Sequence, residues 1–234
     1  MTIKLITFDL DNTLWHTDPV IIRAERILWA WIQTHCPVAS KRFNPQSLQA
    51  LKVKVARDKP ELRHKLSQLR LEFLYQVFIA CDLSNLQARR LAEQAFSEFL
   101  QARNQITLFP GALDLLHALQ TDYQVIALSN GNSDLKTIGL DHLFNAHFHA
   151  ENVAQPKPHA DMFRAALEFS GIRAGASCVH IGDHPEQDVY AAQQLGFHTV
   201  WANMLDNQWP TPLPLADYEI TRLNQLLPIL KQLN

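Results

Sequence analysis

Two kinds of hydrophobic spacing alternate along residues 106–234. Short apolar runs have the pattern of buried strands, and between them apolar residues recur every three or four positions, as on one face of a helix. Gly171 and Gly196 end two of the helical segments, which is typical of helix C-termini. The pattern predicts strands at 125–128, 147–150, 178–181 and 199–202, and helices at 113–119, 161–169, 187–195 and 222–233.

Residues 16–105 have only the helical spacing. Aspartate, asparagine and serine are favoured as N-caps, and proline is favoured in the first turn of a helix. These signals predict four helices, which begin near Asp18-Pro19, Asn44-Pro45, Lys59-Pro60 and Ser84.

The run 3–8, IKLITF, is a further strand, and it lies before the helical segment. Alternating strands and helices of this length predict an α/β fold, a Rossmann-like doubly wound parallel sheet with helices on both faces. The early strand joins this sheet only if the helical segment is an insertion. We therefore expect one domain made of 1–15 and 106–234, and an inserted all-helical domain at 16–105.

Composition narrows the class of protein. With 234 residues, of which 47% are hydrophobic and 19% charged, the chain can bury a substantial core. Its apolar runs are too short for a secretory leader or a membrane span, so we expect no membrane partner. The cysteines, Cys36, Cys81 and Cys178, are odd in number and far apart, which argues against a disulfide framework. These features predict a cytoplasmic protein.

Charge is distributed unevenly. Residues 16–105 carry 14 basic and 8 acidic side chains, whereas the rest of the chain carries 7 basic and 15 acidic ones. This asymmetry is compatible with an anionic substrate and with a carboxylate-rich site that needs a cation, although helical surfaces are often basic. The chain has no dense basic tracts, so we expect no nucleic-acid partner.

Polar residues follow three of the predicted strands. They are Asp9 to Thr13, then Ser129-Asn130-Gly131, then Gly182-Asp183 with Asp188 close behind. A lysine, Lys157, precedes a helix. Each cluster alone is ordinary turn or cap chemistry. Because the carboxyl ends of parallel strands meet at one edge of a sheet, together they predict a common site.

In this order the clusters resemble the four motifs of the haloacid dehalogenase superfamily. The matching segments are FDLDNTL at 8–14, LSNGN at 128–132, Lys157 within QPKP, and GDHPEQD at 182–188. The helical insertion also resembles the mobile cap of that superfamily. The resemblance covers the catalytic domain from end to end.

The resemblance implies a nucleophile, an acid/base and a metal site. Asp9 would attack phosphorus to form an aspartyl-phosphate, and Asp11 would protonate the leaving oxygen and later activate water. In haloacid dehalogenases proper the second position is generally not aspartate, so Asp11 favours phosphoryl chemistry. Mg²⁺ would be held by the Asp9 carboxylate, the Asp11 carbonyl and Asp183, with Asp188 acting directly or through water.

The resemblance also implies a phosphate-binding set. Ser129, the backbone amides of Asn130 and Gly131, and the Lys157 ammonium would neutralise the phosphoryl oxygens in the transition state. Thr13 would orient the loop of the first motif or hydrogen-bond the phosphate. The expected partner is therefore a small phosphorylated metabolite, bound by a monomer or a weak homodimer.

Within the superfamily, PVIIRAERI, LSNGN and KPHADMF look similar to bacterial phosphatases of the flavin pathway. Those enzymes act on the ribityl-aminouracil phosphate intermediate and on flavin mononucleotide. Sugar phosphates, nucleotides and phosphoglycolate remain open as substrates. A phosphomutase would share every catalytic residue. A phospho-accepting signalling protein would share the aspartates but is roughly half this length and lacks the insertion.

Overall fold

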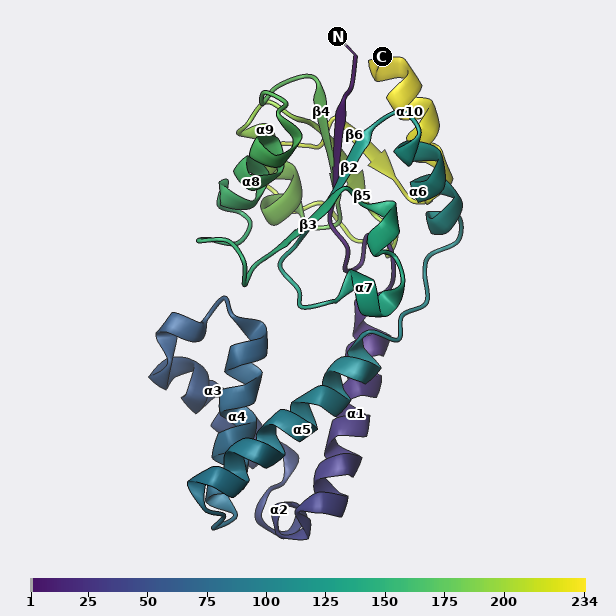
Figure 1. The fold of residues 1–234 in the computed structure, drawn as a ribbon. Coiled ribbons are helices and arrows are strands. Elements are labelled where there is room, and N and C mark those ends of the chain that lie inside the picture. Colours follow the sequence, from purple (N-terminus) through teal and green to yellow (C-terminus); the bar gives the residue numbers. More distant parts are fainter. Residues whose placement is uncertain (1) are drawn as a thin grey trace. The chain divides into compact units, whose positions relative to one another are not determined.

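The computed structural model describes residues 2–234, and the chain folds as two compact units (Figure 1). The first consists of the chain up to Thr17 together with Ile106–Asn234. The second is Asp18–Gln105, which consists of helices.

The first unit is built on a parallel sheet of six strands in the order β3-β2-β1-β4-β5-β6. This confirms the predicted doubly wound α/β fold. The four residues of the central strand β1 are all buried, as expected when helices cover both faces. The sixth strand is missing from the prediction, because three residues are too few to show a period. The strands are β1 (Leu5–Phe8), β2 (Gln124–Ser129), β3 (Ala146–His149), β4 (Cys178–Gly182), β5 (His198–Ala202) and β6 (Tyr218–Ile220).

Helices cover both faces of the sheet. On one face Phe8, Leu116 and Leu226 belong to one hydrophobic core, and on the other Leu5 and Phe163 belong to a second. Each such side chain contributes about 1.5–3 kcal/mol by its burial. The first face carries α6 (Ala112–Gln120), α7 (Leu135–Ile138), α10 (Leu226–Leu233) and the short η2 (Asp141–Leu143) and η4 (Leu223–Gln225); the second carries α8 (Asp161–Ser170) and α9 (Ala191–Gln193), preceded by the π-helix η3 (Pro185–Tyr190).

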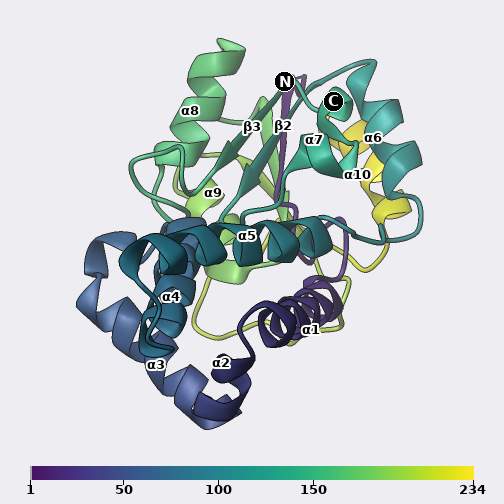
Figure 2. The same ribbon diagram turned by 60° about the horizontal axis from the view of Figure 1, so that its bottom comes forward.

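The second unit has its own core, in which α4 packs against both α3 and α5 (Figure 2). Asn44 and Ser84 cap two of its helices as predicted. The helix expected from Pro60 begins later, at Leu66, because Pro60 opens only one 3₁₀ turn. The elements are α1 (Thr17–His35), α2 (Pro37–Arg42), α3 (Pro45–Asp58), η1 (Pro60–Leu62), α4 (Leu66–Ala80) and α5 (Asn85–Arg103).

An ionic contact ties three of these helices together. Glu25 on α1 accepts hydrogen bonds from Lys52 on α3 at 3.3 Å and from Arg70 on α4 at 2.8 Å. Burial raises the pKa of Glu25, but the two cations outweigh burial and lower it. Across residues 2–234, none of the helices is both long enough and apolar enough to span a bilayer.

Candidate active site

The predicted site residues gather where the strand order of the sheet reverses. β1 and β4 are neighbours, and each is followed by an aspartate, Asp9 and Asp183. The Asp9 N–H donates to the carbonyl of Ile181 at 2.8 Å, which extends the pairing of the two strands to the site. In open α/β sheets, ligands bind at the carboxyl ends of the strands at such a reversal.

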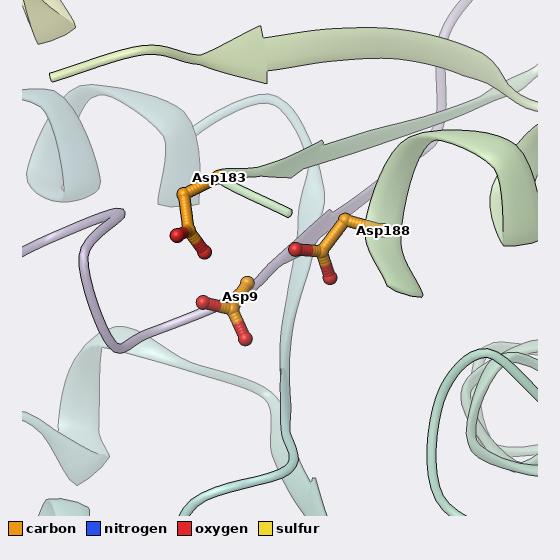
Figure 3. A group of neighbouring side chains, drawn as sticks. All are labelled: Asp9, Asp183 and Asp188. Atoms are coloured by element: carbon orange, nitrogen blue, oxygen red, sulfur yellow. The ribbon is translucent and has the colours of Figure 1, made fainter. Parts of the chain in front are cut away.

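Three carboxylates converge at this point (Figure 3). Asp9, Asp183 and Asp188 each offer an oxygen, and these oxygens lie within 4.8 Å of one another. Burial and the neighbouring negative charges raise the pKa of Asp9 to about 7 although Lys157 opposes the shift, and they raise the pKa of Asp183 to about 8. Such a cluster stabilises a bound cation and is destabilised by its own repulsion.

Lys157 joins the cluster from a segment 148 residues away from Asp9 in sequence. Its ammonium lies 2.8 Å from Asp9 Oδ1 and also contacts Asp188 Oδ1, and its side chain is 1% exposed. Burial lowers the pKa of Lys157, but the two aspartates outweigh burial and raise it. Burial likewise raises the pKa of Asp188, and Lys157 with His180 outweighs burial and lowers it. Lys157 and Asp188 therefore form an ionised pair.

Asp188 is the most tightly held carboxylate of the three. Oδ1 accepts from Lys157 and lies 3.1 Å from His180 Nε2, and Oδ2 accepts from the His184 backbone at 2.9 Å. The carboxylate lies directly over Gly182, where a Cβ would be 2.3 Å from Asp188 Cγ. Glycine at 182 is thus required by the position of Asp188.

Asp11 lies in the loop of the first motif, but its carboxylate is not part of the three-carboxylate cluster. Asp11 Oδ1 accepts from Trp15 Nε1 at 2.9 Å and from the Thr17 hydroxyl at 2.8 Å. Asn12, which tolerates the left-handed conformation it adopts here, exchanges hydrogen bonds with Thr17. The Thr13 hydroxyl donates to Asp9 Oδ2 at 3.3 Å. The loop is therefore locked by its own side chains.

The second motif connects to Lys157 through Asn130. The side-chain amide of Asn130 donates through Nδ2 to the Lys157 carbonyl at 2.8 Å and accepts at Oδ1 from the Lys157 backbone N–H at 3.0 Å, as a neighbouring strand would. The same amide donates to Gln187 at 2.8 Å. Ser129 is buried, and its hydroxyl accepts from the Gly131 N–H at 3.0 Å. Asn130 thus acts through its side chain, whereas the sequence suggested only its backbone amide.

Several residues that support the site were not singled out from the sequence. His180 follows an apolar residue in a buried strand, and the turn after β4 brings Asp188, eight residues later, against its ring. Thr17 and Trp15 lie within eight residues of Asp9, so proximity to the first motif was the available signal. Trp201 donates to the Asp183 carbonyl at 2.7 Å from the adjacent strand β5, a contact that sequence distance conceals.

The three-carboxylate cluster fits a hard divalent cation. Its donors are all oxygens, they are buried or half-buried, and their mutual repulsion would be relieved by positive charge. One ammonium, that of Lys157, offsets only part of the charge of the three carboxylates. Asp9 thus belongs to the carboxylate cluster and also contacts Lys157 through Oδ1 and Thr13 through Oδ2.

Comparison with known proteins agrees with this geometry. The family model of haloacid dehalogenase-like hydrolases matches residues 3–196. The chain is 31% identical over 228 residues to 5-amino-6-(5-phospho-D-ribitylamino)uracil phosphatase YigB of Escherichia coli (strain K12), covering 96% of this chain and 94% of that protein.

Two solved structures share the fold. One is described as a 2-haloacid dehalogenase from Pseudomonas syringae pv. Tomato DC3000, with a TM-score of 0.94, 32% identity and complete coverage of both chains. The other is a magnesium-bound form of the putative HAD-hydrolase YfnB from Bacillus subtilis, with a TM-score of 0.66, 23% identity, and coverage of 98% of this chain and 99% of that one. The second likeness concerns the fold alone.

Proposed function

Because the chain belongs to the haloacid dehalogenase-like hydrolase family, we propose that it is a magnesium-dependent phosphatase of a small phosphorylated metabolite. The observation that carries the proposal is the contact of Asp9 with Lys157 inside a cluster of three carboxylates. A phosphate dianion could approach so many carboxylates only beside compensating positive charge.

Mg²⁺ suits the cluster because it prefers oxygen ligands and retains several waters. Asp9 and Asp183 would hold it with the Asp11 carbonyl, and Asp188 would act directly or through water. When bound, Mg²⁺ would supply Lewis-acid stabilisation of the transferring phosphoryl group.

Asp9 is the proposed nucleophile. One carboxylate oxygen would attack phosphorus as the bond from phosphorus to the leaving oxygen breaks, which leaves an aspartyl-phosphate. Water would then attack that phosphorus and release inorganic phosphate and the free Asp9 carboxylate. The contacts from Lys157 and Thr13 orient Asp9 for both displacements.

Asp11 is the proposed acid and base of the two steps. Its proton would go to the leaving alkoxide in the first displacement, and its carboxylate would accept a proton from water in the second. The hydrogen bonds from Trp15 and Thr17 to Asp11 Oδ1 orient this carboxylate for the exchange. Ser129, the amides of Asn130 and Gly131, and Lys157 would balance the charge on the other phosphoryl oxygens.

A haloacid dehalogenase is the second candidate, because a solved structure with 32% identity carries that description. In that reaction Asp9 would attack carbon and displace halide. Halide leaves without a proton and the substrate brings no phosphate dianion, so neither Asp11 nor a cation cluster would be needed. The presence of both favours the phosphatase.

The substrate proposal comes from the relatives. We infer that a ribityl-aminouracil phosphate is a candidate substrate, because the relative that matches 96% of the chain is named for that activity. The helical domain, 16–105, would then be the cap that selects the substrate, with flavin mononucleotide as a second compound to test. A phosphomutase with the same residues would return the phosphoryl group to a sugar.

The test is a panel of substrates with the wild-type protein and its Asp9→Asn variant. We expect Mg²⁺-dependent phosphate release from p-nitrophenyl phosphate and from at least one phosphorylated metabolite, abolished by Asp9→Asn and by a chelator. Isomerised sugar phosphate with little free phosphate would instead identify a mutase. Chloride release from a 2-chloro acid, without phosphate release from any ester, would overturn the proposal in favour of the dehalogenase.

A further inference from the structure

His180 is not one of the clustered carboxylates, but it lies behind one of them, Asp188. It is in the middle of β4, is 1% exposed, and its side chain projects to the α8 side of the sheet. There its ring makes an edge-on contact with Phe163, with 4.9 Å between the ring centroids. The simplest interpretation of such a residue is core packing, and apolar packing needs no imidazole.

Both ring nitrogens of His180 have polar partners. Nδ1 lies 2.8 Å from the Thr7 hydroxyl, on the residue directly opposite in β1, and Nε2 lies 3.1 Å from Asp188 Oδ1. Because the Asp188 carboxylate can only accept, Nε2 must carry a proton. The Thr7 hydroxyl also lies 3.3 Å from the Val179 carbonyl, to which it can donate. The contact with Asp188 therefore places a proton on Nε2, and the contact with Thr7 fixes the rotation of the ring.

This arrangement determines how Asp188 meets the site. Oδ1 receives two donors, the Lys157 ammonium and His180 Nε2, and Oδ2 receives the His184 backbone N–H. Without His180, Oδ1 would be held by Lys157 alone, and the carboxylate could rotate about its contact with His184 and away from Asp9 and Asp183. Groups behind metal-binding residues typically change metal affinity or activity by about 10–100-fold when removed.

We propose that His180 is a positioning residue, oriented by Thr7, that fixes Asp188 for cation binding and for alignment of Lys157. The proposal rests on the proposed phosphatase function. It assigns no direct contact with substrate to His180. Its hydrogen bond, rather than its volume, is the property that matters.

Four variants separate the hydrogen bond from packing. His180→Leu keeps an apolar body but has no donor, whereas the amide of His180→Gln can still donate to Asp188. Thr7→Val is nearly isosteric and removes only the hydroxyl that orients the ring. Phe163→Leu disturbs packing against the ring but leaves its hydrogen bonds, so it serves as the packing control.

The measurements are the Mg²⁺ dissociation constant of the metal-free protein by calorimetry, and kcat and KM for p-nitrophenyl phosphate. We expect His180→Leu to weaken Mg²⁺ binding at least about tenfold and to lower kcat by about 10–100-fold, with KM changed much less. His180→Gln should recover most of both losses. Phe163→Leu should lower the melting temperature yet bind Mg²⁺ as the wild type does.

Two results would overturn the proposal. The first is a His180→Leu variant whose Mg²⁺ affinity and kcat stay within about threefold of wild type, where about 10–100-fold losses are expected. The second is a His180→Gln variant that recovers neither loss. If His180→Leu does not fold, Thr7→Val and an imidazole ¹⁵N spectrum of the wild type decide: a proton on Nδ1 but not on Nε2 refutes the assignment. If the wild type binds Mg²⁺ but releases no phosphate, the proposed phosphatase function is wrong, while the calorimetry still tests the role of His180. If the wild type binds no Mg²⁺, both proposals are wrong.

Discussion

A single methyl group at Gly182 is expected to disable the site. In Gly182→Ala the new Cβ would lie 2.3 Å from Asp188 Cγ and 2.5 Å from Oδ2. Non-bonded carbon atoms prefer about 3.5–4.0 Å, so the carboxylate must move by more than about 1 Å. Backbone strain adds little, because Gly182 is not among the positive-φ residues.

That displacement would break a closely fitted arrangement. Asp188 is fixed by Lys157, His180 and the His184 backbone, and it cannot move by 1 Å without lengthening these hydrogen bonds beyond their working range. A misplacement of that size in an active site can cost about 10²-fold in rate. Overpacking should destabilise the fold by about 1–3 kcal/mol, or a few degrees in melting temperature.

The assay is steady-state phosphate release with a parallel Mg²⁺ titration. Gly139→Ala is the control, because a Cβ there would meet no atom within 4 Å and its cost is limited to a left-handed backbone. We expect Gly139→Ala to lose stability but not kcat, and Gly182→Ala to lose about 10²-fold in kcat. If Gly182→Ala kept wild-type kcat and Mg²⁺ affinity, the position of Asp188 would not require glycine at 182.

Two further predictions concern pH and the helical unit. Asp9 and Asp183 have pKa values of about 7 and about 8 in the folded protein against an ordinary 3.8, so the stability they contribute to the metal-free protein is lost as pH rises toward 8. Saturating Mg²⁺ should therefore raise the melting temperature more at pH 8 than at pH 6, and an equal rise would contradict this. Glu25→Gln should destabilise the protein by about 1 kcal/mol in urea unfolding, since its contacts are partly solvated. The exposed pair of Arg57 and Asp58 provides the control: Asp58→Asn should change the free energy of unfolding by less than about 0.5 kcal/mol, and an equal effect of the two substitutions would contradict the assigned role of Glu25.

The sequence predicts the sheet and its connections well, because the spacing of hydrophobic residues and the residue types of turns are local properties of the chain. The strands ending at Phe8, Ser129 and Gly182 each carry a buried run followed by polar residues. Strand β6 escapes prediction because Tyr218–Ile220 is too short to show a period. The π-helical turn of η3 escapes too, since the same apolar spacing suits an ordinary helix over 187–195.

The candidate site divides in the same way. Residue types and spacing suggest Asp9, Asp183 and Lys157 as a group, and the structure brings them together. The contact of Asn130 with Lys157 joins segments 27 residues apart, and no local pattern encodes their alignment. The contact of His180 with Asp188 spans only eight residues, but it depends on how the chain turns after β4, which residue spacing does not specify. Both supporting roles become visible only in three dimensions.

If Asp9 accepts the phosphoryl group, the phosphorylated aspartate can be trapped and located in the chain. Asp11→Asn lacks the base for the second displacement, while p-nitrophenolate leaves without needing a proton in the first. The variant would be mixed with p-nitrophenyl phosphate and Mg²⁺, quenched in acid within milliseconds, digested and analysed by mass spectrometry. We predict one phosphoryl group on the peptide that contains Asp9, absent when Asp9→Asn is added. Release of p-nitrophenolate without any phosphorylated peptide, or with the group on another residue, would contradict the account.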